Sequence, residues 1–171
     1  MRLHLVDLNE HVVGAWHRAF SDFSDVMIKH GDLLEDAENC IVSPANSYGF
    51  MDGGIDAAYL SFFGPQIERT VQEAIANRPE KLLPVGASLF VRTRNARIPY
   101  LIVAPTMTTP EMVESNNCYR AMRAVLRIAS AYPELRRDVY CPGLATGVGM
   151  VSADDAALMM AQAYREWKSK G

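Results

Sequence analysis

Short apolar runs alternate along the chain with longer segments in which apolar residues recur every three or four positions. The short runs are typical of buried strands, and the longer segments are typical of helices with one apolar face. The pattern predicts strands at residues 2–7, 25–30, 38–43, 86–93, 99–104 and 138–141. It predicts helices at residues 10–20, 55–62, 65–77, 110–131 and 153–168.

Residues at the ends of these segments agree with the pattern. Asn9 is a good N-cap for the first helix, because its side chain can accept a hydrogen bond from the first turn. Pro65 and Pro110 stand where helices begin, and Pro133 stands where the long helix would end. The helix bounds are therefore supported by local chemistry as well as by periodicity.

The order of the predicted elements indicates the fold class. Strands that alternate with helices imply a three-layer α/β/α domain with a mixed, mostly parallel sheet of about six strands. The chain has 171 residues, which is enough for one domain with a substantial core. No repeat or linker divides it, so we expect a single domain over residues 1–171.

The first candidate site is the glycine-bearing loop after the apolar run at residues 40–42. The loop carries Asn46, Gly53 and Gly54, and the helix that follows has Asp56 in its first turn. Exposed N–H groups and the helix dipole favour a phosphate at such a place, and glycine lets the backbone approach it closely. The alternative is a loop of ordinary turn residues, because this is neither a Walker nor a dinucleotide fingerprint.

A second loop of the same kind follows the last predicted strand. Residues 139–150 form a short apolar run and then a segment with Gly143, Gly147 and Gly149, and a helix begins near Ser152. Two such loops at the ends of two strands would hold a diphosphate from both sides.

Three motifs in these segments resemble those of the macrodomain family, whose members bind ADP-ribose. Residues 43–46 match the family's Asn-Ala-Ala-Asn segment, and residues 52–56 match its glycine run and the following Val-Asp. Residues 145–150 match its second loop, Ser-Thr-Gly-Ile-aromatic-Gly, and residues 31–33 match its Gly-Asp-Ile. The resemblance covers roughly residues 26–167.

The resemblance implies a role for individual residues. Asp32 would accept a hydrogen bond from the adenine amino group, Asn46 would hold the distal ribose, and Asp56 would contact that ribose or an attacking water. The plainer alternatives are a helix-cap aspartate, a turn asparagine and an aspartate that stabilises a helix dipole. The implied catalytic residues are Asn46 and Asp56, and the implied ligand-binding residues are Asp32, Leu33, Asn46, Gly53, Gly54, Ile55, Thr146, Gly147, Val148 and Gly149.

Some positions depart from the family pattern. Gly149 stands where many relatives carry an aromatic residue over the distal ribose, and Met150 or Phe50 would have to fill that space. Asp52 adds a negative charge near an anionic ligand, which is unfavourable unless the side chain points to solvent. An adenine-stacking aromatic residue is also missing, since its place would fall near Val6 or Leu8.

The order of elements departs as well. A typical macrodomain continues after its last helix with one more strand and helix, whereas this chain begins with an extra strand and helix at residues 2–20. We interpret this as a circular permutation, which is tolerated when termini are close. The alternative is an unrelated N-terminal addition to a truncated sheet.

The resemblance implies a hydrolase that releases ADP-ribose from mono-ADP-ribosyl esters on acidic side chains, or from O-acetyl-ADP-ribose. The alternatives are a reader module that binds ADP-ribose without turnover and a phosphatase that acts on ADP-ribose 1″-phosphate. The expected partner is ADP-ribose or an ADP-ribosylated protein, and no cofactor is expected. The interval from Asn46 to Asp56 favours the enzyme, whereas Gly149 and Asp52 favour the reader.

Composition bounds the remaining possibilities. The formal charge of −3 makes a nucleic-acid or membrane partner unexpected. The three cysteines and four histidines lack metal-ligand spacing, so no metal site is expected. Cysteines in apolar strands are typical of reduced thiols, which favours a cytoplasmic protein.

Overall fold

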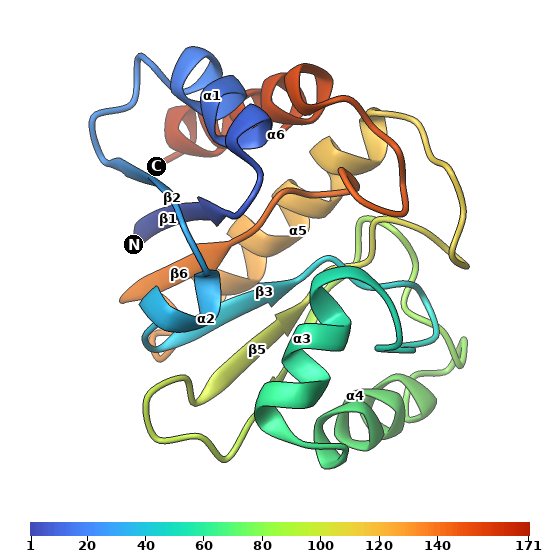
Figure 1. The fold of residues 1–171 in the computed structure, drawn as a ribbon. Coiled ribbons are helices and arrows are strands. Elements are labelled where there is room, and N and C mark those ends of the chain that lie inside the picture. The colour runs from blue at the N-terminus through green and yellow to red at the C-terminus, as the bar shows by residue number, and fades with distance from the viewer.

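The computed structural model describes residues 1–171, and its centre is one six-stranded sheet (Figure 1). The strand order is β2-β1-β6-β3-β5-β4, and every neighbouring pair is parallel except β4 and β5. The expected mixed, mostly parallel sheet is therefore confirmed. The strands are β1 (Arg2–Asp7), β2 (Val26–His30), β3 (Cys40–Ser43), β4 (Leu89–Arg92), β5 (Tyr100–Val103) and β6 (Asp138–Cys141).

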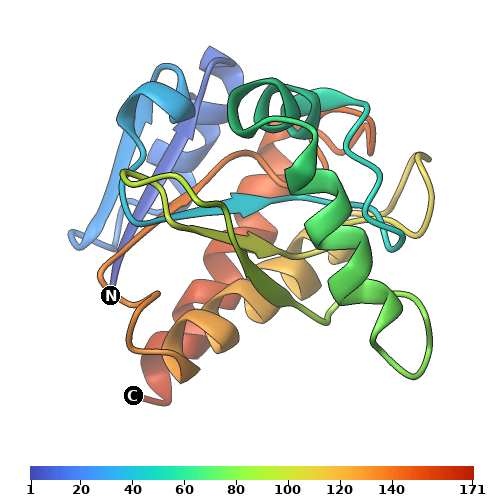
Figure 2. The same cartoon turned by 90° about the horizontal axis from the view of Figure 1, so that it is seen from below.

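Helices cover both faces of this sheet. The helices are α1 (Glu10–Ala19), α2 (Leu33–Asp36), α3 (Gly54–Phe63), α4 (Gln66–Ala76), α5 (Asn116–Ala131) and α6 (Ala153–Ser169). One buried cluster joins a sheet face to α1, α5 and α6, and a smaller cluster joins the opposite face to α2, α3 and α4. Figure 2 shows α5 and α6 on one side of the sheet and α3 and α4 on the other.

The strands alternate between these two cores because successive side chains point to opposite faces. Cys40 and Val42 of β3 belong to the larger cluster, and Ile41 between them belongs to the smaller one. In β1, Leu3 and Leu5 face the larger cluster and Val6 faces the smaller one. A central parallel strand is therefore apolar on both faces, which is why β3 reads as a continuous apolar run.

The sequence pattern misplaces some boundaries. The long helix was expected from Pro110, but α5 begins at Asn116, and residues 110–115 form a loop. The backbone N–H of Val113 donates to the carbonyl of Gly149 at 3.0 Å, so this segment is held against a distant loop instead of continuing the helix. The strand expected at residues 86–93 is shorter than predicted, and helix α2 was not predicted because four residues are too few for a periodic pattern.

Strand β1 is an interior strand. It pairs in parallel with β2 on one side and with β6 on the other, and α1 packs on the same face as α6. This interior position is the one that a permuted closing unit requires. That the relatives carry the unit at the other end of the chain stays a prediction. No helix in residues 1–171 is long and apolar enough to span a membrane.

The position of β1 leads to a test of the N-terminal segment. Deleting residues 1–20 should abolish cooperative thermal unfolding, because it removes an interior strand and exposes the ladder edges of β2 and β6. Circular dichroism during a thermal melt measures this loss. A truncated protein that still melts cooperatively would show that the segment is an appendage.

Two point substitutions test the contribution of β1 to stability without deleting the strand. Leu5→Ala should lower the free energy of unfolding by about 2–5 kcal/mol, because it leaves a cavity in the core. Leu5 is fully buried, whereas Leu8, three residues further along, is 71% exposed. Leu8→Ala should therefore leave the free energy of unfolding almost unchanged.

Candidate functional site

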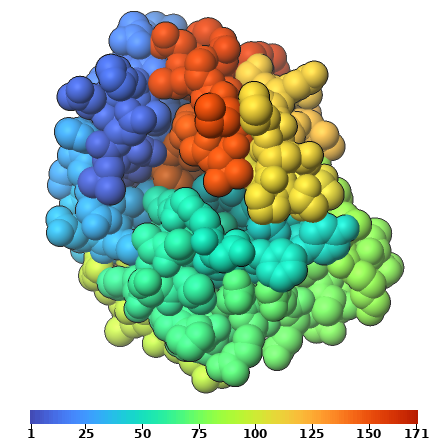
Figure 3. All heavy atoms as spheres, turned by 45° about the vertical axis from the view of Figure 1, so that its right-hand side comes forward, coloured from blue at the N-terminus to red at the C-terminus, as the bar shows by residue number.

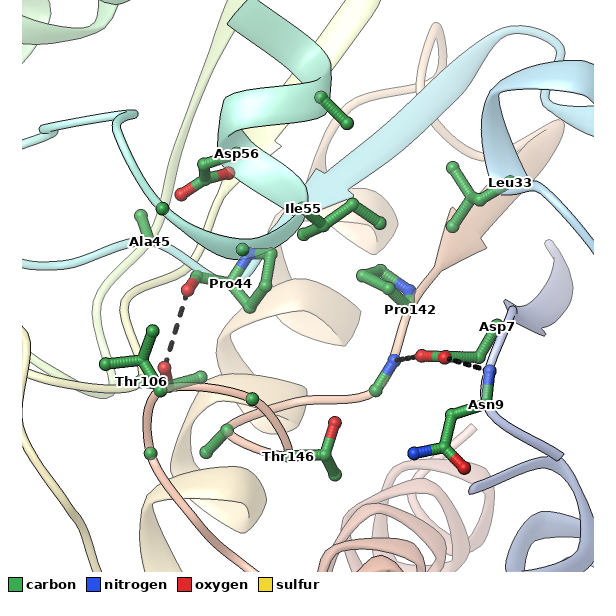
Figure 4. A pocket seen from close by; sticks show the side chains of 18 of the residues that line it. Asp7, Asn9, Leu33, Pro44, Ala45, Ile55, Asp56, Thr106, Pro142 and Thr146 are labelled. Atoms are coloured by element: carbon green, nitrogen blue, oxygen red, sulfur yellow. Dashed lines mark hydrogen bonds between the residues drawn. The ribbon is translucent and has the colours of Figure 1, made fainter. Parts of the chain in front are cut away.

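A pocket of about 480 Å³ lies at the carboxyl ends of the parallel strands (Figure 4). In open α/β sheets this end is the usual place for a ligand, because the loops that follow several strands converge there. The loops after β1, β2, β3, β5 and β6 all contribute to its wall. Figure 3 shows the loops before α3 (cyan to green), before α5 (yellow) and after β6 (orange) next to one another on one face.

The structure brings all the sequence-predicted site residues to this one pocket. Its lining includes Asp32, Leu33, Asn46, Gly53, Gly54, Ile55, Asp56, Thr146, Gly147, Val148 and Gly149. It also includes Val6 and Leu8, the aliphatic residues at the place expected for an adenine-stacking aromatic. Residues far apart in the sequence therefore meet where the two glycine loops face each other.

At one end of the pocket, Asp32 is the N-cap of α2. Its Oδ1 atom accepts a hydrogen bond from the backbone N–H of Leu34 at 2.9 Å, so the cap role is present. Its other carboxylate oxygen makes no hydrogen bond within the protein. A carboxylate has capacity for several hydrogen bonds, so this oxygen remains available to a donor in the pocket.

The first glycine loop presents the start of α3 to the pocket. Gly53 is the N-cap and supplies no side-chain hydrogen bond, so the first N–H groups of the helix have no partner in the protein. A Cβ atom added at Gly53 or Gly54 would meet nothing within 4 Å, so the space beside both is open. Gly54 has a φ angle of 57°, a conformation that glycine adopts without strain.

The amide of Asn46 organises the same loop. Its Oδ1 atom accepts from the backbone N–H groups of Tyr48 at 3.1 Å and Phe50 at 3.3 Å, and its Nδ2 atom donates to the carbonyl of Phe50 at 2.9 Å. The local turn role of Asn46 is therefore present. One N–H of the amide is left for a ligand, because a side-chain amide has two donors.

The second glycine loop is closed by bonds at its end. Met150 N–H donates to Gly147 O, and Val151 N–H donates to Ala145 O, both at 3.0 Å. The backbone N–H groups of residues 146–149 make no hydrogen bond within the protein, so they are free to bind an anion. The two loops thus place unpaired donors on two sides of the pocket.

The shape of this second loop also explains one departure from the family pattern. A Cβ atom at Gly149 would lie 2.7 Å from the carbonyl oxygen of Ala145, which is too close for any side chain. The missing aromatic residue is therefore a consequence of how tightly this loop turns. Of the two residues expected to fill the space, Phe50 lines the pocket and Met150 does not.

Sequence reasoning missed Asp7, which joins two walls of the pocket. Its Oδ1 atom accepts from the backbone N–H of Asn9, and its Oδ2 atom accepts from the backbone N–H of Gly143, both at 2.9 Å (Figure 4). Gly143 comes directly after Pro142 at the end of β6, 136 residues further along the chain. No local signal marks such a contact, since it exists only once β1 lies beside β6.

Sequence reasoning also missed the wall that follows β5. Thr106, Met107 and Pro110 line the pocket. The Thr106 hydroxyl donates to the carbonyl of Pro44 at 3.4 Å, which ties this wall to the end of β3. Only Pro110 drew attention in the sequence, as the start of a helix that does not begin there.

Asp56 is buried beneath the first loop with only 6% of its surface exposed. The Ser43 hydroxyl donates to its Oδ1 atom at 2.6 Å, and its other oxygen has no partner in the protein. Burial raises the pKa of Asp56 to about 7, because desolvation disfavours the charged form, and the hydrogen bond from Ser43 partly opposes that rise. The carboxyl group is therefore poised to exchange a proton near neutral pH.

The charged residues of the pocket are all acidic. Asp7, Asp32, Asp52 and Asp56 line it, and no lysine, arginine or histidine does. Asp52 is exposed and lines the pocket, so whether its charge points to solvent stays a prediction. An anion in this pocket would therefore depend on backbone N–H groups. The structure contains no group of three or more histidine, cysteine, aspartate or glutamate residues that could hold a metal ion.

Comparison with known proteins identifies the family to which this pair of glycine loops belongs. The family model described as Macro domain matches residues 42–160, which is more than half of the chain and includes both glycine loops. The chain belongs to the macrodomain family.

Relatives and solved structures agree with this assignment. An uncharacterized protein of Aquifex aeolicus is 35% identical over 147 residues, covering 85% of this chain and 84% of the relative. The macrodomain of Mycobacterium tuberculosis DarG superposes with a TM-score of 0.67 at 20% identity, covering 80% of this chain and 87% of that one. A mutant of the Oceanobacillus iheyensis macrodomain with ADPR superposes with a TM-score of 0.68 at 20% identity, covering 80% of this macrodomain and 74% of that chain.

The environment of Asp56 predicts how the stability of this macrodomain depends on pH. Its ordinary pKa is 3.8 and its folded pKa is about 7, so the folded state binds the proton more tightly than the unfolded state. The free energy of unfolding should therefore fall as pH rises from about 4 to about 7, by at most about 1.4 kcal/mol per pH unit from this group. Denaturant unfolding of wild type and Asp56→Asn across this range measures the difference.

Asp56→Asn has no carboxyl group at this position, so its free energy of unfolding should lack this dependence on pH. Ser43→Ala removes the hydrogen bond that favours the ionised form and should move the end of the transition to higher pH. If the free energy of unfolding changed with pH equally in wild type and Asp56→Asn, the raised pKa of Asp56 would be contradicted.

Proposed function

We propose that the pocket binds ADP-ribose, with the diphosphate between the two glycine loops, the adenine beside Asp32 and Leu33, and the distal ribose beside Asn46 and Asp56. The observation that carries the proposal is that two rows of unpaired backbone N–H groups face one pocket from opposite sides. Such groups bind phosphate without a cationic side chain, which suits a pocket that has none. The Oceanobacillus macrodomain with ADPR supports the same ligand class.

The adenine end supports this orientation. The free oxygen of Asp32 suits the exocyclic amino group of adenine, which guanine replaces with a carbonyl. Val6, Leu8 and Leu33 supply apolar surface nearby, although no aromatic ring is present to stack on the base. We therefore expect affinity for ADP-ribose in the micromolar range, a free energy of about −8 kcal/mol.

We further propose that the protein hydrolyses mono-ADP-ribosyl esters of acidic side chains or O-acetyl-ADP-ribose. The free oxygen of Asp56 would accept a proton from a water molecule as that water attacks the anomeric or the ester carbon. In attack at the anomeric carbon, the bond to the acidic side chain would break as the new carbon–oxygen bond forms, and that side chain would leave as a carboxylate. In attack at the ester carbon, a tetrahedral intermediate would form first, and the proton taken up by Asp56 would pass to the ribose oxygen as the carbon–oxygen bond to it breaks. A carboxyl group with a pKa of about 7 is well matched to accept a proton near neutral pH.

The second candidate is a reader that binds ADP-ribose without turnover. One observation favours it: the amide of Asn46 is largely committed to its own loop. A phosphatase that acts on ADP-ribose 1″-phosphate is less well supported, because Asp52 and Asp56 would repel a further phosphate dianion. Three buried cysteines without a disulfide support a cytoplasmic setting.

The adenine contact is tested by two substitutions of Asp32. Asp32→Ala should weaken ADP-ribose binding by roughly 1–3 kcal/mol, measured by calorimetry, because a charged acceptor is lost. Asp32→Asn should weaken binding too, yet keep the thermal stability, because asparagine is as good an N-cap as aspartate. An unchanged dissociation constant in both variants would leave Asp32 with its cap role alone.

The enzyme and the reader are separated by turnover. Wild-type protein should release ADP-ribose slowly from a glutamate- or aspartate-linked substrate, and Asp56→Ala should reduce that rate by about 10²-fold or more at saturating substrate. ADP-ribose binding should persist in this variant, because the loop N–H groups and Asp32 are intact. Wild-type protein that binds ADP-ribose and never releases it from ester-linked substrates would be a reader.

A further inference from the structure

The mouth of the pocket carries exposed apolar side chains. Ten large hydrophobic residues of the chain are exposed, and six of them belong to the loops that build the pocket. Leu8, Phe50 and Val148 line it directly. The other three lie in the same loops: Tyr48, Met112 and Met150. Such a concentration on one face is typical of an interaction surface, because single exposed hydrophobic residues are otherwise scattered.

Two of these side chains lie on loops that are bonded together. The backbone N–H of Val113 donates to the carbonyl of Gly149, so Met112 and Met150, the neighbours of these two residues, belong to adjoining loops. Met112 is 76% exposed and Met150 is 67% exposed. Figure 3 shows these two loops, in yellow and orange, side by side on the face where the chain is hollowed by the pocket. Pro110 and Gly149 of these loops line the pocket, whereas Met112 and Met150 do not, so the two methionines lie outside its lining.

The rim of the pocket mouth is also acidic. Asp52, Glu111 and Glu114 are exposed and take part in no ion pair. The loops at residues 44–56, 105–119 and 141–155 contain no lysine, arginine or histidine. We call the apolar residues Phe50, Met112, Val148 and Met150, together with Asp52, Glu111 and Glu114, the mouth patch.

The outer members of the mouth patch, Glu111, Met112, Glu114 and Met150, do not line the pocket and do not suit ADP-ribose itself. ADP-ribose carries two negative phosphate charges, so an acidic rim does not attract it. Its sugars are polar and gain little from contact with exposed methionine side chains. The patch lies beyond the distal ribose in the proposed orientation, where a group attached to that ribose would emerge. The patch is therefore suited to contact the molecule to which the ADP-ribose is attached.

We propose that the mouth patch docks a basic polypeptide segment that carries the ADP-ribosyl group. Lysine or arginine side chains of that segment pair with Asp52, Glu111 and Glu114, and its apolar side chains pack on Met112 and Met150. Complementary charge speeds association and disfavours carriers of the same sign, so nucleic acids and acidic segments are excluded by repulsion. This inference rests on the proposed ADP-ribose site and names the class of protein that would enter it.

The test compares peptides that differ only in the residues around the modified one. Each peptide carries one ADP-ribosyl group through a non-hydrolysable linkage, flanked by lysine and leucine, by glutamate and leucine, or by serine and glycine. The lysine-flanked peptide should bind about tenfold more tightly than the glutamate-flanked one, since several exposed charge pairs each contribute a fraction of that. The preference should shrink at high salt, because exposed charges are screened.

Substitutions in the mouth patch test whether it causes the preference for the lysine-flanked peptide. Glu111→Lys combined with Glu114→Lys should remove or reverse the preference for the lysine-flanked peptide, and leave the affinity for free ADP-ribose unchanged. Glu134→Lys is the matched control, because Glu134 is exposed between α5 and β6, at the amino ends of the strands and away from the pocket. Met112→Ser should weaken binding of both leucine-containing peptides, with free ADP-ribose again unaffected.

The outcomes distinguish this inference from the function on which it rests. Equal affinity for the lysine- and glutamate-flanked peptides, with free ADP-ribose bound normally, would overturn the docking surface and leave the proposed function standing. An ADP-ribosylated oligonucleotide that binds as tightly as the lysine-flanked peptide would also overturn it. Absence of binding by ADP-ribose itself would overturn the proposed function and the docking surface together.

Discussion

The contact between Asp7 and Gly143 depends on the parallel pairing of β1 with β6, and the rest of the site depends on that pairing too. Parallel strands end at the same edge of a sheet, so the loops after β1, β2, β3 and β6 meet there and enclose one pocket. Asp7 then bonds the last residues of β1 to the loop after β6. A Cβ atom at Gly143 would lie 2.5 Å from the hydroxyl oxygen of Thr146 and 3.1 Å from the carboxylate of Asp7, so a larger residue here would displace one or both side chains.

The pocket combines a proposed anion site with an acidic lining, and the two are compatible because the donors are backbone groups and the negative charges are on side chains. The donors would be backbone N–H groups at the start of α3 and in the loop after β6, which have no partner in the protein and belong to residues that line the pocket. Burial raises the pKa of Asp56 to about 7, so this carboxyl group is only partly charged at neutral pH. Both oxygens of Asp7 already accept hydrogen bonds from backbone N–H groups. In the proposed complex, negative charge on the rim would act less on the diphosphate than on the group to which the ADP-ribose is attached.

The same features bear on whether the protein is an enzyme or a reader. Ser43 donates to one oxygen of Asp56, and the other has no partner in the protein, so the proposed proton exchange with a bound water would use that second oxygen. Asn46 is more constrained, because its amide is used to shape the loop from Asn46 to Phe50. Asp56 is therefore the stronger candidate for chemistry, and Asn46 acts mainly by holding the loop that surrounds the distal end of the pocket.

The sequence by itself determined the features that depend on near neighbours. The alternation of apolar runs and amphipathic segments indicated the mixed parallel sheet, and the glycine loops with Asp32 and Asp56 were recognisable because their residues lie within a few positions of one another. Tertiary structure decided what depends on distant partners. Residues 110–115 leave the helical pattern because Val113 bonds to Gly149, and Asp7 joins the site because β1 lies beside β6. The raised pKa of Asp56 also arises only on folding, because burial, which no local pattern reports, removes the water that would stabilise its charge.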